Sequence, residues 1–234
     1  MKFDYQTVTL KGLTMPVDVD ECNTPEQLVT YCARVSNPAN QNNHKTGNKL
    51  LGYLIREHHW SPFEMVNLVM EVKTTRDIGR QILRHRSFSF QEFSQRYAKA
   101  TAFITRDARL QDTKNRQNSI VTEDEALKEW FKSAQEMSIN ITKELYDEAL
   151  ERGVAKEQAR ALLPEGLTMS TLYMNGTLRS WIHFCALRMA NGTQLEHSDI
   201  AIKAWDIVLQ HFPSLRDETV MEAMNIYAKE NLDK

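Results

Sequence analysis

Residues 65–73 constrain the fold more than any other segment, because apolar and polar side chains alternate along them with the two-residue period of a β-strand. The apolar face of this strand consists of Val66, Leu68, Met70 and Val72. The other face is mostly polar, so only one side of the strand needs to be covered. A helical pattern follows directly over residues 75–85, with apolar side chains on one face and Arg76, Arg80 and Arg84 on another. These patterns predict an α+β fold in which a small antiparallel sheet packs against several helices.

The rest of the chain is predicted to add two short strands and more helices. The strands are expected at residues 5–9 and 16–20, and the helices at 24–37, 46–58, from 122 onward, 155–163, 177–190, 194–211 and after Pro213. Residues 88–97 are expected to form a loop or an irregular strand, and residues 101–121 a surface loop. The second half is therefore helix-rich, and residues 1–234 are expected to form a single domain.

Two of the helices begin with a capping-box pattern. Thr24 and Gln27 form the first, with a proline between them at a position that suits the first helical turn. Its expected buried stripe is Leu28, Cys32 and Val35. Thr122 and Glu125 form the second pattern. The apolar stripe that follows it comprises Leu127, Trp130, Ala134, Met137, Ile141 and Leu145.

The composition argues against several classes of protein. The chain has 29 Lys and Arg residues against 31 Asp and Glu residues, a formal net charge of −2 that disfavours a protein whose main role is to coat nucleic acid or an anionic membrane. Its 8 glycines form neither a GxGxxG nor a GxxxxGK[ST] pattern, so side chains would have to hold the phosphates of any bound nucleotide. The 3 cysteines are too few for a disulfide framework or a cysteine zinc site, and no metal is expected. No membrane span or signal peptide is readable, which favours a cytoplasmic protein.

The densest chemistry lies in residues 84–97, which contain three arginines, a histidine, a glutamate and three serines. Arginines that flank a histidine at a helix end repel one another unless an anion neutralises them. Planar guanidinium groups and serine hydroxyls suit a phosphate. From spacing alone, an anion-binding site and an ordinary solvated basic face are about equally supported.

Two other segments are weaker candidates. Residues 58–64 contain two histidines and a glutamate, but their spacing matches no defined metal-ligand pattern, so a packed turn is the better interpretation. Further along the chain, Arg160 is followed by Arg179, His183 and Arg188, and the last three roughly share one helical face. For an isolated helix, a salt-bridged surface stripe would be the better interpretation of that face.

Taken together, these segments resemble the flavin-dependent thymidylate synthases. The arrangement Arg-His-Arg, seven residues, then Ser-Gln-Arg-Tyr over residues 84–97 is similar to the signature of that family. Residues 59–64 resemble its histidine-containing turn, and residues 153–164 and 175–188 resemble its second and third conserved blocks. The similarity covers most of residues 20–210.

The resemblance implies an enzyme that methylates dUMP to dTMP. It implies methylenetetrahydrofolate as the carbon donor, FAD reduced by NADPH as the hydride source, and a homotetramer with active sites shared between subunits. The residues implied for dUMP are Gln81, Ile82, Leu83, Arg84, Glu92, Phe93, Ser94, Gln95, Arg96, Arg188 and, from a neighbouring subunit, Arg160. The residues implied for FAD are His59, Ser61, Glu64, Arg84, His85, Arg86, Glu92, Asn175, Thr177, Arg179 and His183.

The resemblance assigns the catalytic role to Arg188. Carbon 5 of uracil is a poor nucleophile until negative charge builds up on the ring, and a fixed arginine stabilises that charge. Ser94 is expected to bind substrate rather than attack it, because the cofactor performs the difficult step.

Two alternatives to an active enzyme remain open from the sequence. The first is a nucleic-acid-binding α+β module whose residues 76–97 would contact phosphates through arginines and stack bases on Phe88, Phe90 and Phe93. The second is a member of the family that has lost activity and kept nucleotide binding.

Overall fold

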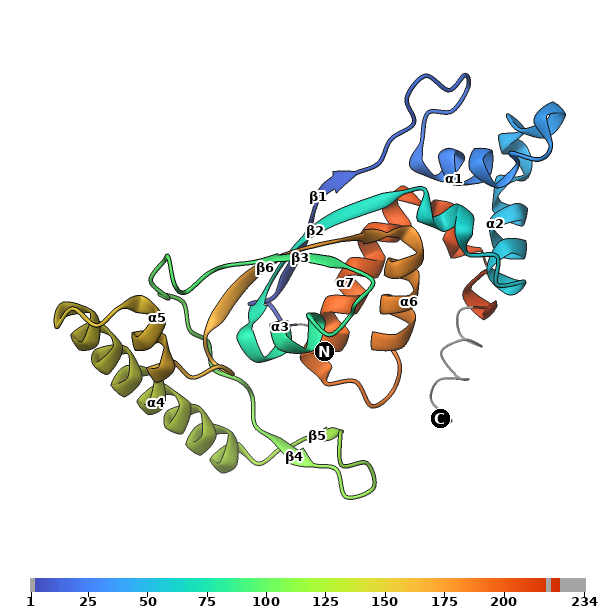
Figure 1. The fold of residues 1–234 in the computed structure, drawn as a ribbon. Coiled ribbons are helices and arrows are strands. Elements are labelled where there is room, and N and C mark those ends of the chain that lie inside the picture. The colour runs from blue at the N-terminus through green and yellow to red at the C-terminus, as the bar shows by residue number, and fades with distance from the viewer. Residues whose placement is uncertain (1–2, 218–219, 224–234) are drawn as a thin grey trace.

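The centre of the molecule is a four-stranded antiparallel sheet with the strand order β1-β2-β6-β3 (Figure 1). The computed structural model describes residues 3–217 and 220–223. The strands are β1 (Thr7–Leu13), β2 (Asn67–Thr75), β6 (Met169–Thr177) and β3 (Ser89–Glu92). The predicted α+β class, with a small antiparallel sheet and helices, is confirmed.

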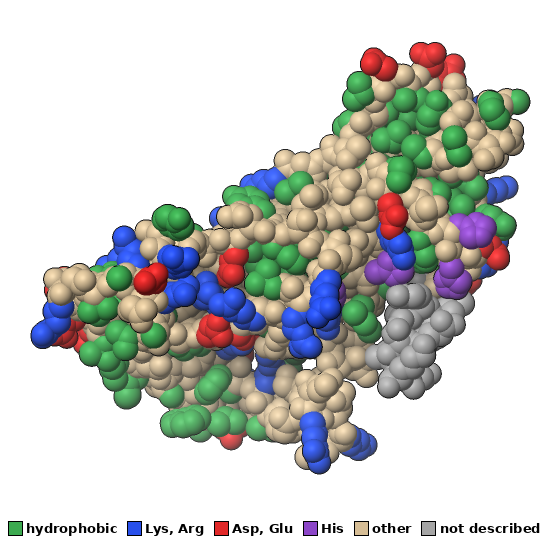
Figure 2. Space-filling view, viewed as in Figure 1, with side chains coloured by type: hydrophobic (Ala, Val, Ile, Leu, Met, Phe, Trp, Pro, Cys, Tyr) green, Lys and Arg blue, Asp and Glu red, His purple; other side chains and the backbone are tan. Residues whose placement is uncertain are grey.

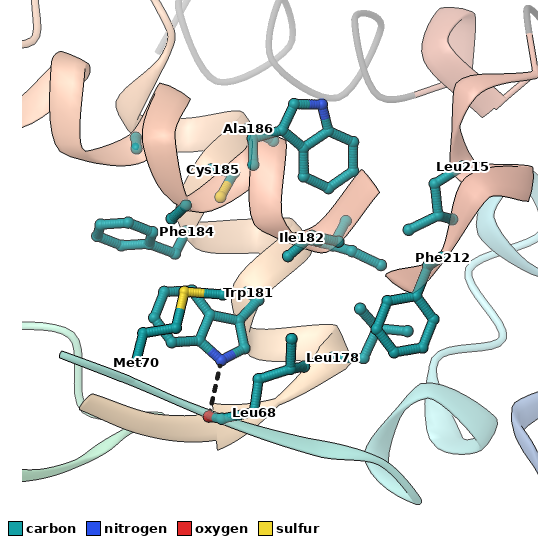
Figure 3. Packing of buried hydrophobic residues seen from close by; sticks show 14 of the residues in the cluster. Leu68, Met70, Leu178, Trp181, Ile182, Phe184, Cys185, Ala186, Phe212 and Leu215 are labelled. Carbon is teal, nitrogen blue, oxygen red and sulfur yellow. Dashed lines mark hydrogen bonds between the residues drawn. The ribbon is translucent and has the colours of Figure 1, made fainter. Parts of the chain in front are cut away.

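The strand predicted at residues 65–73 is β2, and its apolar face forms the middle of the core. Leu68 and Met70 are fully buried, and Val72 is 1% exposed. From the neighbouring helix, Trp181 donates its indole N–H to the backbone carbonyl of Leu68 at 3.2 Å (Figure 3). This bond gives a fully buried polar group a partner and fixes the helix against the sheet.

Three helices cover one face of the sheet, and the remaining helices lie toward its two ends (Figure 1). The covering helices are α3 (Arg76–Ile82), α6 (Leu178–Arg188) and α7 (Leu195–His211). Helices α1 (Pro25–Ala33) and α2 (Gly47–Arg56) lie at one end of the molecule, and α4 (Glu125–Glu151) and α5 (Lys156–Ala159) at the other. Short 3₁₀ turns occupy Pro38–Asn40, His44–Thr46, Ser61–Glu64, Arg160–Leu162 and Pro213–Arg216.

The first helix illustrates what local sequence determines well. Thr24 and Gln27 form the predicted capping box, with both reciprocal hydrogen bonds present. The predicted buried stripe is wrong in part, because Val35 lies beyond the end of the helix and is 69% exposed, while Val29 is fully buried. The expected strand at residues 16–20 is also absent, and β1 runs later than predicted, over residues 7–13.

Helix α4 differs from its prediction at the cap and along its apolar face. Asp124, rather than Thr122, caps the helix by accepting a hydrogen bond from the backbone N–H of Leu127. The predicted stripe exists but is not covered in the single chain: Trp130 and Met137 are each 64% exposed, and Ile141 is 52% exposed.

Strand β6 was not predicted, although it pairs along its whole length with β2 and also pairs with β3. Its inward-facing residues are Ser170, Leu172, Met174 and Gly176, a set that mixes apolar, polar and small side chains. Gly176 is required by packing, because a Cβ atom there would lie 2.4 Å from the ring of Phe88. The expected loop at residues 101–121 also contains a hairpin of β4 (Arg109–Gln111) and β5 (Ser119–Val121).

The last predicted helix is described only in part. The chain forms the turn Pro213–Arg216 and is helical at residues 220–223, and the remainder of that prediction lies outside the described residues. None of the helices in the described part of the chain is both long and apolar enough to cross a membrane.

Candidate active site

Helix α3 connects two groups of functional side chains. Its first residue, Arg76, borders a cavity of about 490 Å³. Its last turn contains Gln81, and the chain then continues into the segment 84–97. Because an α-helix rises about 1.5 Å per residue, the two ends of this helix are separated by roughly 10 Å.

The first group lines the cavity with arginines and carboxylates. The lining residues are Arg76, Arg80, Gln95, Glu157, Arg160, Ala161, Leu163 and Glu165. Basic and acidic side chains alternate across this part of the surface (Figure 2). Arg80 pairs with Glu165 at 3.0 Å, and both side chains are about half exposed. Arg160 and Gln95 of one chain therefore border the same cavity.

The segment 89–97 leads from the sheet into this cavity. Glu92, at the end of β3, accepts hydrogen bonds from Arg76 at 3.2 Å and from the hydroxyl of Ser170 at 2.9 Å. Ser94 and Arg96 follow in a turn, and the guanidinium of Arg96 lies 3.4 Å from the carboxylate of Glu157. Gln95 is buried, whereas Phe93 is 39% exposed. The strand and the Arg76–Glu92 pair thus fix the start of the turn, while its hydroxyl and its arginine remain accessible.

The second group lies at the other end of α3 and centres on His85 and Arg188. Arg188, in the last turn of α6, donates a hydrogen bond from Nε to His85 Nε2 at 2.8 Å. Burial, together with the charges of Arg188 and Arg84, lowers the pKa of His85 from 6.5 to about 4. His85 is therefore neutral at physiological pH and can accept this bond. Burial and the charge of Arg84 also lower the pKa of Arg188, so the protonated guanidinium is less stable at this position than in water.

Two glutamines and a second histidine lie beside this pair. Gln81 donates a hydrogen bond from Nε2 to Gln194 Oε1 at 2.7 Å. Its Oε1 lies 3.2 Å from Nδ1 of His197, a fully buried residue of α7. The rings of His85 and His197 have their centroids 6.0 Å apart. The structure thus adds Gln194 and His197 to the predicted residues.

The residues proposed for the flavin include a group near the start of α6. Arg179 pairs with Glu64 at 2.5 Å, joining α6 to the turn Ser61–Glu64. The ring centroids of His183 and Trp60 lie 4.3 Å apart. Burial, Arg179 and His58 lower the pKa of His183 to about 4. His59 and Ser61 are exposed beside this group, and Asn175 and Thr177 precede it at the end of β6.

The chain offers cations suited to the pyrophosphate of a dinucleotide cofactor. Arg84 and Arg86 are exposed, and neither forms a salt bridge with another residue in the ranges 3–217 and 220–223. Guanidinium groups without an acidic partner suit a bound phosphate. The available residues therefore fit a cofactor that carries phosphate, held by side chains rather than by a glycine loop.

Three sequence-based expectations can be compared directly with this geometry. Ile82 is fully buried, so only its backbone is available to a substrate, and Leu83 is partly buried at the end of α3. Phe88 is 8% exposed and packs against Trp181 with ring centroids 4.9 Å apart, so it cannot stack a nucleic-acid base as the binding-module alternative requires. Among the described residues, no group of three His, Cys, Asp or Glu side chains is arranged to hold a metal.

The missed residues Gln194 and His197 gave little signal in the sequence. They lie at the start of a helix whose polar side chains are otherwise ordinary, and only the packing of α7 against α3 brings them to Gln81. In the loop before them, Gly192 has a φ of +87° and lies near the β4–β5 hairpin, because a Cβ there would be 3.4 Å from the side-chain nitrogen of Asn115.

Fold and site together define an α+β protein whose clustered arginine and amide side chains suit a phosphorylated ligand. Residues 19–214 match the family described as thymidylate synthase complementing protein. The chain belongs to this family, that of the flavin-dependent thymidylate synthases, as its resemblance in residues 59–64, 84–97, 153–164 and 175–188 predicted.

Individual relatives agree with this assignment. A flavin-dependent thymidylate synthase from Synechocystis is 52% identical over 212 residues, covering 91% of this chain and 97% of the relative. A probable flavin-dependent thymidylate synthase from Paramecium bursaria Chlorella virus 1 is 51% identical, covering 88% and 95%. A crystal structure of the UMP/dUMP methylase PolB from Streptomyces cacaoi, bound with 5-Br dUMP, aligns with a TM-score of 0.78 and 26% identity, covering 94% of this chain and 95% of that chain.

Proposed function

We propose that this chain catalyses the reductive methylation of dUMP to dTMP, with methylenetetrahydrofolate as carbon donor and FAD, reduced by NADPH, as hydride source. The observation that supports the proposal most directly is Arg188, held by the neutral side chain of His85 at the start of the family signature. Relatives that share about half of its residues carry the name of this enzyme.

In this proposal, the phosphate of dUMP is bound in the arginine-lined cavity. Ser94, Arg96 and Arg160 supply a hydroxyl and two guanidinium groups near its rim. Arg96 pairs with Glu157 in the free protein, so a bound phosphate would replace this carboxylate as the partner of the Arg96 guanidinium.

Arg188 would act on the uracil ring. A guanidinium placed against a ring oxygen stabilises the negative charge that develops when carbon 5 attacks the transferred carbon. His85 holds Nε of Arg188 and so leaves the two terminal nitrogens to the substrate. The neighbouring amide of Gln81 offers a further polar contact to the base.

Arg84, Arg86 and Arg179 would hold the cofactor, together with the aromatic group around His183 and Trp60. When bound, FAD supplies the hydride, which removes the need for a nucleophilic side chain. Ser94 is accordingly assigned to substrate binding.

We further propose a cytoplasmic homotetramer with shared active sites. Two observations support it. The predicted substrate residues divide between the two ends of α3, so a site could take one group from each of two chains. The exposed apolar face of α4 also resembles a protein interface more than a solvent-exposed surface.

The absorbance spectrum of the purified protein tests the proposed function. We expect flavin bands that bleach when NADPH is added, and dTMP formation that requires both dUMP and methylenetetrahydrofolate. A colourless protein that takes up neither FAD nor dUMP would refute the proposal, and a yellow protein that binds dUMP without turnover would identify an inactive family member.

A further inference from the structure

We propose that His197 is a positioning residue, which fixes the side-chain amide of Gln81 so that it accepts a uracil base and disfavours cytosine. The inference rests on the proposed function, because it takes Gln81 to be a contact of the nucleotide base. Nothing in the predicted substrate or cofactor sets includes His197.

The hydrogen bonds around Gln81 define the orientation of its amide. The amide nitrogen donates to Gln194 Oε1 at 2.7 Å, so the amide oxygen faces the other way. That oxygen lies 3.2 Å from His197 Nδ1, which must then carry the hydrogen. If the Gln81 amide were rotated by 180°, its nitrogen would face the N–H of His197 Nδ1, and its oxygen would face Gln194 Oε1. Both contacts would then be unfavourable.

The environment of His197 keeps its ring neutral, and the contact with Gln81 Oε1 places the single N–H on Nδ1. Its side chain is fully buried, and burial together with Arg188 and His85 lowers its pKa to about 3. The ring is therefore neutral at physiological pH and has a single N–H. That N–H lies on Nδ1, toward Gln81.

A role in packing alone does not account for an imidazole at this position. His197 Nε2 is buried, and it has no hydrogen-bond partner in the part of the chain that the structure describes. A buried polar atom without a partner is unfavourable, and its neighbours include the ring of Phe184, with centroids 5.7 Å apart. A leucine of similar volume would suit such surroundings better, so the useful part of the side chain is Nδ1.

The orientation has a consequence for base recognition. After its bonds to Gln194 and His197, the Gln81 amide retains one N–H and one lone pair on its oxygen. Uracil offers a carbonyl and an N3–H side by side, which match such a donor and acceptor. Cytosine offers an amino group and an unprotonated N3, the reverse order, which would require the rotated amide.

The test measures binding of dUMP and dCMP to the FAD-loaded full-length protein by calorimetry, with thermal stability recorded for each variant. His197→Asn places a side-chain N–H near the position of Nδ1. His197→Gln places its polar atoms near the position of Nε2 instead, and His197→Leu removes both nitrogens. His211→Leu, in the last turn of the same helix, is the matched control.

We expect His197→Leu and His197→Gln to weaken dUMP binding about 3- to 10-fold, the worth of one net hydrogen bond, and to narrow the preference for dUMP over dCMP. His197→Asn should keep the wild-type affinity for dUMP and the wild-type preference over dCMP. His211→Leu should change neither of these quantities. His197→Leu should melt no lower than the wild type, because it removes the unpartnered Nε2.

Three results would overturn the inference: unchanged binding in His197→Leu, an equal loss in His197→Asn, or ¹⁵N spectra that show the hydrogen of His197 on Nε2. The spectra require no ligand. Failure of the proposed function has a different signature, because there the wild-type protein itself would not bind dUMP.

Discussion

The two ends of α3 hold their arginines in different ways. At the cavity, Arg80 lies 3.0 Å from Glu165 and Arg96 lies 3.4 Å from Glu157, in pairs that are substantially exposed. At the other end, Arg188 is half-buried and is bonded to neutral His85 at 2.8 Å. The first arrangement neutralises the cation with a carboxylate, whereas the second fixes its position and leaves its charge uncompensated.

This difference suits the two tasks proposed for the site. Exposed ion pairs are weak and screened by salt, so a phosphate can replace the carboxylate at little cost. A half-buried arginine held by a neutral partner is already oriented and has its full charge available for a substrate. The cavity end should therefore respond to ionic strength, and the His85–Arg188 end to loss of a side chain and to acid.

The largest effect is expected from Arg188→Ala. Formation of dTMP should fall at least about 100-fold, because the charge that stabilises the uracil ring is lost. FAD content should stay unchanged, as judged by the flavin absorbance. Arg152→Ala, at the exposed end of α4, is the control, and turnover retained by Arg188→Ala would contradict the proposed role.

A smaller effect is expected from Ser94→Ala. Its Kd for dUMP should rise about 3- to 10-fold, as expected for one lost hydrogen bond, and activity at saturating dUMP should remain measurable. Ser133→Ala, on the exposed surface of α4, is the control. Complete loss of activity with normal dUMP affinity would favour a nucleophilic serine instead.

The buried histidines should make the protein sensitive to acid. The pKa of His197 falls from 6.5 to about 3 in the folded chain, so below about pH 6.5 the unfolded chain binds a proton that the folded chain does not. The free energy of unfolding should therefore fall as the pH decreases toward about 3, and this contribution should be fully present above about 6.5. Denaturant titrations at about pH 7 and pH 4 should show a smaller decrease in the free energy of unfolding for His197→Asn than for the wild type. Equal decreases would contradict the lowered pKa of His197.

The smallest effect is expected from Glu157→Gln, which releases Arg96. Binding of dUMP should tighten by no more than about 3-fold at low salt, since exposed pairs contribute little, and the gain should vanish at high salt. Glu148→Gln breaks a pair in α4 away from the cavity and is the matched control. An effect of Glu157→Gln that persists at high salt would show that the pair does more than neutralise Arg96.

Local patterns predicted the elements whose signal lies within a few residues. Thr24 and Gln27 marked the start of α1 because both hydrogen bonds of the capping box join near neighbours. Strand β2 was predicted because its buried residues Leu68, Met70 and Val72 form an uninterrupted apolar face over the predicted span. Strand β6 was missed since its buried face contains Ser170 and Gly176, whose suitability depends on Glu92 and on the ring of Phe88.

The candidate site divides in the same way. The signature residues Arg84, Ser94 and Arg96 were readable because they lie close together in the chain. The network of Gln81, Gln194 and His197 was not, since it joins residues 113 and 116 positions apart.

The sequence by itself determined the α+β class, the family and the types of side chain in the candidate site, because these depend on periodicity and on residues arranged in short runs. The tertiary structure alone decided which of those side chains carry a fixed charge and which are partnered. Packing of α6 and α7 against α3 places His85 beside Arg188 and buries His197, and burial sets their pKa values. Desolvation and hydrogen-bond geometry arise from contacts between distant segments, so no local pattern could have shown them.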